Sequence, residues 1–409
     1  MEELLWVAVV LGLLLRLISL YFGGIACFAL KKEVQYPQAK KMRRIAVMTA
    51  ARNEESVIGG FIESIQKQEY PQELFDVFVI PNNCTDNTEG TAKAYGAQII
   101  HCPFPVKHKG DALHQALMQL QKKGYDAFCI FDSDNIVKSD FLLRINDAFD
   151  AGAKVVKGRQ LACNAHASWV SGCYNIYFNL FHLFFNKARG ACGLSAKLVG
   201  TGFAVHKDVL ERLGGWNTAT IAEDAEFSAQ CALLGERVWW VPDAITYDEQ
   251  PTSFRTSLVQ RRRWCSGIMQ VAKLEFTSLV KRLFKPNWAF AADFTMFLMG
   301  AFAQALSIVP LGLTFLAAVL DGGDGILNFF QVMGAYFVFY YSIMFSMAVF
   351  LTYHQEKKVF PKEMRSAIFM FPIFMASWIP LQVLSLFKET SSWKEIRHTG
   401  KNKSSLPTS

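Results

Sequence analysis

The sequence predicts an α/β domain with a doubly wound, mostly parallel sheet, joined to helices that contact or cross a membrane. Short apolar runs alternate with helix-like stretches between residues 45 and 131, which is typical of βαβ units. Both ends of the chain are strongly apolar, and 52% of the 409 residues are hydrophobic, including 35 Phe. The length allows one large globular domain with further segments. A membrane protein with a globular middle part is therefore predicted.

The N-terminal residues 1–30 predict a transmembrane helix. They are nearly all apolar apart from Arg16 and the first acidic pair, and about 20 such residues suffice to cross a bilayer. Six Lys and Arg residues follow within 31–44, which predicts an outside N-terminus and a cytosolic globular domain. A cleaved signal peptide is the alternative, but Glu2 and Glu3 make its start acidic and the apolar run is too long.

The globular domain is expected over residues 43–275. Its first half should contain strands at 45–49, 76–80, 98–101 and 127–131, with helices from about 56 and over 88–95 and 111–122. In such sheets ligands bind beyond the carboxyl ends of the strands. Site residues are therefore expected in the loops that follow the strands.

The loop after the strand 127–131 contains two carboxylates. Asp132 and Asp134 alternate along an extended loop, so both can offer oxygens to one hard cation. Mg²⁺ or Mn²⁺ typically takes one or two carboxylates together with substrate phosphates. An Asp-rich turn or a helix cap explains this pair equally well when it is taken alone.

Polar residues also follow the other strands. Asn53 and Glu54 could cap the next helix or face a nucleotide, and Asn82 and Asp86 lie in a turn-rich stretch before a helix start. Lys109 stands at a helix N-terminus, where backbone N–H groups and cations suit a phosphate. A solvated lysine is the alternative for that position.

The order of these motifs is more specific than any one of them. It is Ala50-Ala51-Arg52-Asn53-Glu54, Asn82-Asn83-Cys84-Thr85-Asp86, Lys109-Gly110, Asp132-Ser133-Asp134, Gly200-Thr201-Gly202, Glu223-Asp224 and Gln260-Arg261-Arg262-Arg263-Trp264. It resembles the membrane-embedded glycosyltransferases of family 2, which include cellulose, hyaluronan and poly-N-acetylglucosamine synthases. The resemblance covers about residues 43–270, with membrane segments at both ends, and implies a Rossmann-like fold of the glycosyltransferase A type.

The resemblance also implies roles for these residues. Asn53, Glu54, Asn82 and Asp86 would line a uridine pocket; Lys109, Gln260 and Arg263 would contact the donor; Asp132 and Asp134 would contact ribose, diphosphate and Mg²⁺ or Mn²⁺; and Thr201, Gly202 and Trp264 would contact the acceptor. Relatives usually carry Asp where Asn82 stands, but an amide still offers a carbonyl oxygen to uracil N3–H. A UDP-sugar donor is therefore expected.

Glu223 and Asp224 open an amphipathic helix, 225–234, which Gly235 ends. Carboxylates at a helix start are common caps. Inversion at a sugar C1, however, needs a general base that takes the proton of the acceptor hydroxyl. By resemblance Asp224 would be that base, with Glu223 as the next candidate.

Gln260 and Arg263 lie three residues apart and share one face of a predicted helix, with Trp264 beside them. Arg and Gln can bind a leaving-group phosphate, and a Trp ring stacks on sugar. The three arginines of this stretch, 261–263, are alternatively a basic cytosolic flank of the next membrane segment.

Interfacial and transmembrane helices are expected over 276–389. An interfacial helix is predicted at 169–187, with a buried core helix as the alternative, and a second interfacial segment at 279–288. Spans at 290–320, kinked at Pro310, and at 326–353 would be joined by an outside turn at 321–325. The stretch 366–387 contains Pro372 and Pro380 and is predicted to be re-entrant or interfacial, so that the tail 390–409 stays cytosolic.

The sequence argues against a zinc protein and against a nucleic-acid-binding protein. Nine cysteines lack the spacing of a zinc site and indicate a reduced compartment. The net charge of +7 fits contact with anionic lipid and an anionic substrate, and no nucleic-acid recognition motif is present.

The leading hypothesis is an inverting, metal-dependent enzyme of the cell membrane. It would move glucose or N-acetylglucosamine from a UDP-sugar onto a growing β-linked polysaccharide, with its catalytic domain in the cytosol. Gln260 to Trp264 favour a polymer, because the dolichyl-phosphate-sugar synthases that the first half also resembles lack this motif. Transfer of one sugar to a lipid and a non-catalytic membrane scaffold are the alternatives.

Overall fold

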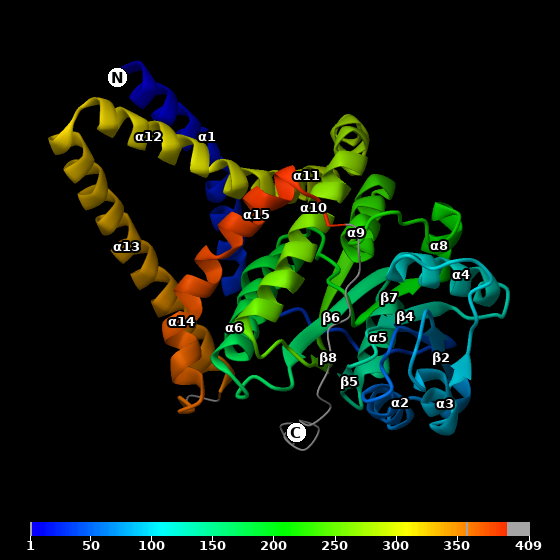
Figure 1. Ribbon diagram of the computed structural model, residues 1–409. Helices are drawn as coiled ribbons and strands as arrows, with labels where there is room; N and C mark the ends of the chain where they lie inside the picture. The colour runs from blue at the N-terminus through cyan, green and yellow to red at the C-terminus, as the bar shows by residue number, and fades with distance from the viewer. Residues whose placement is uncertain (1, 357–358, 391–409) are drawn as a thin grey trace.

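The computed structural model describes residues 2–356 and 359–390. It joins a globular α/β domain to a group of long apolar helices (Figure 1). The predicted tail lies outside the described residues from 391 onward.

One eight-stranded sheet forms the centre of the globular domain. Its strands are β1 (Ile45–Ala51), β2 (Phe75–Pro81), β3 (Gln98–Ile99), β4 (Ala127–Phe131), β5 (Ile136–Val137), β6 (Val155–Ala162), β7 (Phe203–His206) and β8 (Val238–Asp248), in the order β3-β2-β1-β4-β7-β6-β8-β5. The first four are parallel, whereas β7 is antiparallel to β4 and β6, and β5 is antiparallel to β8. The α/β fold is confirmed. The sheet is mixed, because β7 lies between β4 and β6 and runs antiparallel to both.

Helices cover both faces of this sheet. They are α2 (Ile58–Gln66), α3 (Thr88–Ala94), α4 (Lys109–Leu120), α5 (Phe141–Asp150), α8 (Lys207–Leu213) and α9 (Glu223–Leu234). Alternate residues of β1 belong to two separate cores, with Ile45 and Val47 packed toward α2 and α5, and Ala46 and Met48 packed toward α4 and α8. A strand buried on both faces is expected to be mostly apolar, and β1 has one polar residue, the buried Thr49.

The loops that carry the predicted site start at one edge of the sheet. Ala51 at the end of β1 pairs with Pro81 at the end of β2, and Thr49 pairs with Phe131 at the end of β4. The segments after these three strands therefore leave the sheet side by side. This is the edge at which a site was predicted.

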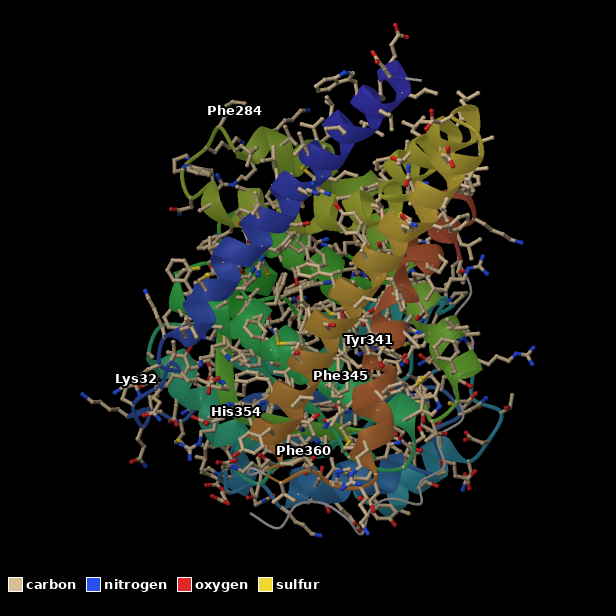
Figure 2. The ribbon with its side chains drawn as sticks, turned by 90° about the vertical axis from the view of Figure 1, so that its left-hand side faces the viewer. Lys32, Phe284, Tyr341, Phe345, His354 and Phe360 are labelled. Carbon is tan, nitrogen blue, oxygen red and sulfur yellow. The ribbon has the colours of Figure 1, made fainter. Side chains whose placement is uncertain are left out.

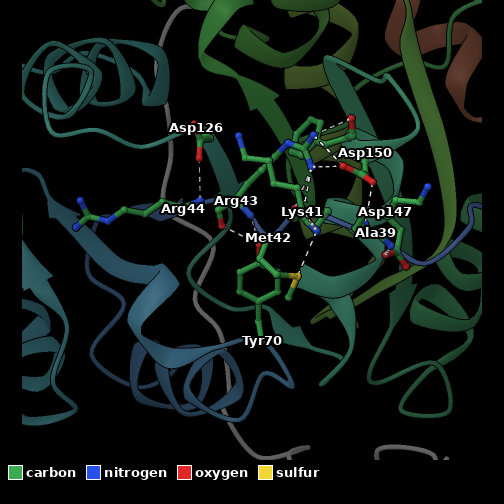
Figure 3. A network of polar contacts seen from close by, with 12 residues as sticks. Ala39, Lys41, Met42, Arg43, Arg44, Tyr70, Asp126, Asp147 and Asp150 are labelled. Carbon is green, nitrogen blue, oxygen red and sulfur yellow. Dashed lines mark hydrogen bonds and ion pairs between the residues drawn. The ribbon is translucent and has the colours of Figure 1, made fainter.

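The segment before the sheet is fixed by polar contacts. Helix α1 (Glu2–Ala26) ends in a short 3₁₀ turn (Cys27–Leu30), and the chain then reaches β1 through the basic stretch. Arg43 Nη1 lies 3.3 Å from Asp150 Oδ1, and Arg44 N donates to Asp126 Oδ2 at 3.1 Å (Figure 3). Ala39 N also donates to an α5 carboxylate, at 2.8 Å. The end of α1 is thus attached to the globular domain.

Helices α10 (Phe254–Arg282), α11 (Ala289–Leu306), α12 (Ile308–Leu320), α13 (Gly323–Gln355), α14 (Met364–Ala376) and α15 (Trp378–Phe387) follow the sheet. Among the described residues, four helical segments are long and apolar enough to cross a membrane: 2–30, 289–320, 323–355 and 364–387. Figure 1 shows the start of α1 near the far end of α12.

Proline sets two breaks in these helices. A proline nitrogen cannot donate to the carbonyl four residues earlier. Helix α11 ends at Leu306, four residues before Pro310, and α14 ends at Ala376, four residues before Pro380. The predicted kink at Pro310 is confirmed, whereas Pro372 lies inside α14 without ending it.

Helix α6 (Trp169–Phe181) continues through a π-helical turn (His182–Lys187) into α7 (Ala188–Ala191). Tyr174 and Phe178 are buried in a cluster with Phe371 and Phe374 of α14, so the aromatic face meets protein. The interfacial interpretation of 169–187 is therefore wrong, and the alternative of a buried core helix is correct.

The second predicted interfacial segment, 279–288, is not a separate helix. Leu279 is fully buried near the end of α10, and the chain then turns toward α11. In that turn Phe284 is 88% exposed and Trp288 is 55% exposed (Figure 2). The aromatic residues there form an exposed turn.

A buried ion pair joins the globular domain to the apolar helices. Arg189 in α7 donates from Nε to Asp293 Oδ2 at 2.9 Å and from Nη2 to Oδ1 at 3.0 Å. Tyr21 in α1 donates to the same carboxylate at 2.7 Å. One carboxylate of α11 therefore fixes α7 and α1 together.

Candidate active site

The loop at 200–202 brings two predicted site regions together. Gly200 N donates to Asp224 Oδ2 at 2.5 Å, and Gly200 O accepts from Lys109 Nζ at 2.6 Å. The φ angle of Gly200 is +51°, and a Cβ there would lie 3.3 Å from Asp132 Oδ2. Asp132, Glu223 and Asp224 together form an acidic centre. Glycine at position 200 allows the backbone itself to contact this centre.

Lys109 pairs with two carboxylates of this centre. Its Nζ lies 2.5 Å from Asp132 Oδ1 and 3.6 Å from Glu223 Oε1. Burial opposes the charge of Lys109, but Asp132, Glu223 and Asp224 outweigh it and raise the pKa of this lysine. Burial also raises the pKa of Glu223; Lys109 opposes that rise, and the charges of Asp224 and Asp132 add to it.

These residues line a cavity of about 1460 Å³. Near the sheet it is polar, and it continues between α1, α11, α12 and α13, where its wall is mostly apolar, for example Val9, Leu13, Phe297, Leu311 and Val332. A polar end at the sheet and an apolar end among the long apolar helices thus form one continuous space.

Most of the predicted site residues share this cavity. They are Glu54, Lys109, Asp132, Asp134, Glu223, Asp224, Gln260, Arg263 and Trp264. Residues from loops after β1 and β4 and from helices α4, α9 and α10 meet there. Their individual roles stay predictions.

Asn82 does not line the cavity, and its predicted contact with a nucleobase stays a prediction. It is 6% exposed, and its amide donates to Ala51 O at 3.1 Å and to Ile80 O at 3.3 Å. Its Oδ1 accepts from Arg52 Nε at 3.2 Å and from Nη2 at 3.1 Å. Asn82 therefore orients Arg52, which itself lines the cavity.

Asn53 and Asp86 hold the loops of this region and do not line the cavity. Asn53 has a φ of +57°, and its Oδ1 accepts from Thr85 N at 2.7 Å. Asp86 Oδ1 accepts from Thr88 N at 3.1 Å at the start of α3, and Oδ2 accepts from Glu55 N at 3.1 Å. The capping and loop-holding interpretation fits both residues better than direct contact with a donor.

Thr201 and Gly202 are buried and do not line the cavity, and their predicted contact with an acceptor stays a prediction. Thr201 Oγ1 accepts from Asp132 N at 3.0 Å and donates to Asn135 Oδ1. Gly202 has a φ of +63°, and its N donates to Ile130 O at 3.0 Å. Both residues position the Asp132–Asp134 loop.

The α10 motif forms one wall of the cavity. Gln260 Oε1 accepts from Tyr174 OH at 2.9 Å, and the Trp264 ring stacks on Trp378 with centroids 6.0 Å apart. Burial lowers the pKa of Arg263, although Glu223 and other acids of the centre oppose this. Arg261 instead donates to Phe374 O at 3.0 Å, so it holds α10 to α14.

The donor set at the sheet edge fits a divalent cation. Asp132 has a side chain 43% exposed, and Asp134 lines the same cavity. Buried Asp248 lies nearby, with an Oδ1 that has no hydrogen-bond partner, and burial followed by the charge of Asp134 raises its pKa. Within the described residues, no group of three His, Cys, Asp or Glu side chains could hold a metal alone. A Mg²⁺ or Mn²⁺ ion here would therefore share its ligands with substrate phosphates.

The sequence analysis missed several polar residues of this region. Lys157 Nζ donates to Thr201 O at 2.7 Å, and burial lowers its pKa to about 7 although nearby acids, Asp248 first, oppose this. Gln160 donates to Asp248 Oδ2 at 2.6 Å. Two signals in the sequence could have indicated these residues. Lys157 lies within the largely apolar start of β6, and Asp248 stands at the end of β8. Lys197, which also lines the cavity, gave no such signal.

Comparison with known proteins identifies the class of enzyme. Probable glycosyltransferase YdaM of Bacillus subtilis is 25% identical over 365 residues, which cover 86% of this chain and 84% of that protein. Beta-monoglucosyldiacylglycerol synthase of Synechocystis sp. is 28% identical over 243 residues, which cover 57% of this chain and 48% of that protein. The match thus spans about half the length of the latter relative.

A solved structure shows the same fold. Mannosyltransferase PcManGT from Pyrobaculum calidifontis, in complex with GDP-Man and Mn²⁺, superposes with a TM-score of 0.64 at 18% identity, covering 88% of this chain and 99% of that one. The family described as Glycosyl transferase family group 2 matches residues 127–378, more than half of the chain. This protein therefore belongs to the family 2 glycosyltransferases.

Proposed function

We propose that this enzyme transfers one sugar from a nucleotide-sugar to the hydroxyl group of a membrane lipid, with inversion at C1. The observation that carries this proposal is the continuous cavity, whose polar end contains Asp224 and whose apolar end lies among the membrane helices. An acyl chain would occupy the apolar end and bring its hydroxyl group to the carboxylate. The similarity to monoglucosyldiacylglycerol synthases supports a lipid acceptor.

The cations at the polar end suit the diphosphate of the donor. Arg52, Lys109 and Arg263 all line it, and guanidinium and ammonium groups pair well with phosphate oxygens. A divalent ion held by Asp132 and Asp134 would neutralise charge on the leaving diphosphate. UDP is proposed as the nucleotide from the motif resemblance.

Asp224 would act on the acceptor side. Its carboxylate accepts from Gly200 N at 2.5 Å, and its Oδ1 accepts from Ala225 N at 2.7 Å, so its orientation is fixed. It would take the hydroxyl proton while the hydroxyl oxygen attacks C1 from the face opposite the diphosphate. The stacked Trp264 and Trp378 would cover the sugar and exclude water.

Product analysis tests this function. Purified enzyme, Mn²⁺ and a panel of radiolabelled UDP-sugars are incubated with vesicles that contain diacylglycerol. Label is expected in an organic-soluble glycolipid that carries a single sugar. Label only in a water-soluble ladder or a high polymer would contradict a lipid acceptor.

Filling the apolar part of the cavity should block acceptor entry. Gly12 on α1 lines the cavity, and a Cβ there meets no atom within 4 Å. We expect Gly12→Phe to raise the KM for lipid at least several-fold, with donor affinity unchanged. Gly24→Phe is the matched control, because Gly24 has equally free space around it but does not line the cavity. Equal loss in both variants would contradict the proposed lipid path.

Polymer synthesis remains a second candidate because of one observation. Trp264 belongs to a cluster of aromatic rings, with Tyr174 at 6.0 Å and Phe178 at 6.3 Å between centroids, beside the acidic centre. Such rings also suit the end of a growing β-linked glycan. The size of the labelled product separates the two candidates.

We further propose that the globular domain is cytosolic and that 364–387 does not cross the membrane. Gln270 of α10 donates to Thr390 O at 3.3 Å, and Lys273 pairs with Glu389, so the chain after α15 returns to the globular domain. Lys32, which follows α1, and His354, near the end of α13, lie toward the same side of the molecule, opposite to the start of α1, which supports this topology (Figure 2).

Cysteine labelling tests the topology. In a background without the nine native cysteines, a cysteine replacing Asp324 should react with an impermeant reagent in intact cells. A cysteine replacing the exposed Lys388 should react only after the cells are opened. Labelling of the Lys388 position from outside would show that 364–387 spans the bilayer.

A further inference from the structure

Lys197 lies where the polar end of the cavity meets its apolar end. Its backbone N donates to Asn186 Oδ1 at 3.0 Å. The next residue, Leu198, donates from its N to Ser228 Oγ at 3.1 Å, and Ser228 stands one helical turn after Asp224 in α9. The backbone of Lys197 is therefore fixed relative to the helix that carries Asp224.

The ammonium group of Lys197 faces the cavity. Its Nζ lies 3.8 Å from the centroid of the Phe297 ring of α11, and both residues line the cavity together with Asp224. Among the described residues, no carboxylate oxygen lies within 4.0 Å of this nitrogen. An ammonium that packs on a ring face keeps N–H donors for a ligand in the cavity.

Two other charged groups act on Lys197. Asp224 on α9 favours the charged form, and Arg189 on α7 opposes it, although Arg189 is paired with Asp293 of α11. Burial is the larger effect and lowers the pKa of Lys197 to about 8. The lysine is therefore mostly protonated at neutral pH and loses its charge as pH rises through about 8.

We propose that Lys197 is a catalytic residue that donates a hydrogen bond to the nucleophilic oxygen of the acceptor, opposite Asp224. This inference rests on the proposed function. The hydroxyl group would lie between the two side chains, accepting from Lys197 Nζ and donating its proton to Asp224. Lysine would thereby fix which oxygen attacks.

The same contact would stabilise the transition state. The oxygen lone pair forms the new bond to C1, the hydroxyl proton passes to Asp224, and the bond from C1 to the diphosphate breaks with its electron pair on the diphosphate. Loss of the proton to Asp224 gives the acceptor oxygen alkoxide character, and the new bond to C1 then draws this charge away. A positioned ammonium is stabilising there because it needs no reorganisation.

Lys197→Met and Lys197→Arg test the proposal. Methionine keeps the packing on Phe297 and removes the donor; loss of one such donor typically lowers kcat about 10²–10³-fold. We expect this loss in transfer, with donor affinity and slow hydrolysis of the donor to water within a few-fold of wild type. Lys207→Met is the control, because Lys207 pairs with Asp126 and does not line the cavity.

A pH profile distinguishes a catalytic contact from packing. Wild-type transfer should fall as pH rises above about 8, because Lys197 then loses its proton. Arginine stays charged, so Lys197→Arg, even if slower, should lack this alkaline fall. Near wild-type transfer by Lys197→Met, or an alkaline fall that Lys197→Arg keeps, would overturn the proposal.

Assays with a lipid acceptor and with a sugar acceptor separate the role of Lys197 from the proposed function. If wild type glycosylates a sugar acceptor and no lipid, the lipid proposal fails. The Lys197→Met defect should then still appear with the sugar acceptor, because a hydroxyl oxygen is the nucleophile in both reactions. A defect in donor affinity instead would assign Lys197 to the donor and overturn the inference.

Discussion

Asp224→Asn is expected to lower sugar transfer by about 10²–10⁴-fold, which is the usual contribution of a general base. The amide keeps an oxygen that can accept from Gly200 N, as Asp224 Oδ2 does. The fold and the donor site should therefore survive. Donor affinity is expected to stay within a few-fold of wild type, because the variant loses the ability to take a proton but keeps the shape of the site.

Donor affinity, donor hydrolysis and glycolipid formation should be measured on this variant in one detergent. Asp208→Asn is a matched control, since Asp208 also lies in the first turn of a helix, α8, pairs with Lys154 at 2.5 Å, and does not line the cavity. Transfer by Asp224→Asn at near wild-type rate would leave that residue with only the structural role of holding the Gly200 loop. Glu223, 3.6 Å from Lys109, would then be the next candidate base.

Asp134→Ala should abolish detectable turnover and weaken donor binding. Charge stabilisation by a bound metal ion is worth several kcal/mol, which corresponds to a loss on the order of 10³-fold or more. Wild-type enzyme in excess EDTA should lose activity in the same way and regain it with Mn²⁺. Binding of labelled UDP to both proteins, with and without Mn²⁺, measures how much donor binding depends on the metal ion.

The control for this variant is Asp243→Ala, because Asp243 is exposed in β8 and does not line the cavity. Its activity and its EDTA sensitivity should match wild type. Full activity of Asp134→Ala, or of wild type in EDTA, would exclude a metal role for this carboxylate.

The strands and the shared edge of the sheet could be predicted because they depend on local patterns. The run 127–131 is apolar throughout, as a strand buried on both faces must be, and the loop after it begins where predicted. Parallel pairing then places the loops after β1, β2 and β4 together. The predicted residues that line the cavity followed from this geometry and from the order of motifs.

Side-chain direction within a loop could not be predicted in this way. Asn82 and Thr201 stand in the correct loops but point into the protein, because the buried polar groups beside them need partners. The apolar face of 169–187 was visible in the sequence, but periodicity cannot tell whether such a face meets lipid or protein. Asn175 and Asn179, which both donate to Gln355 Oε1, were the available sign of a buried helix.

The hydrogen bond between Tyr21 and Asp293 constrains how the enzyme is made. These residues are 272 positions apart in the chain, and ribosomes add about 5–20 residues per second. Helix α1 therefore leaves the ribosome roughly 14–54 s before its partner in α11 exists. During that time its cavity-facing side, including Arg16, is without the helices that later enclose it. The catalytic domain can begin folding first, and the acceptor path is closed only when the last helices arrive.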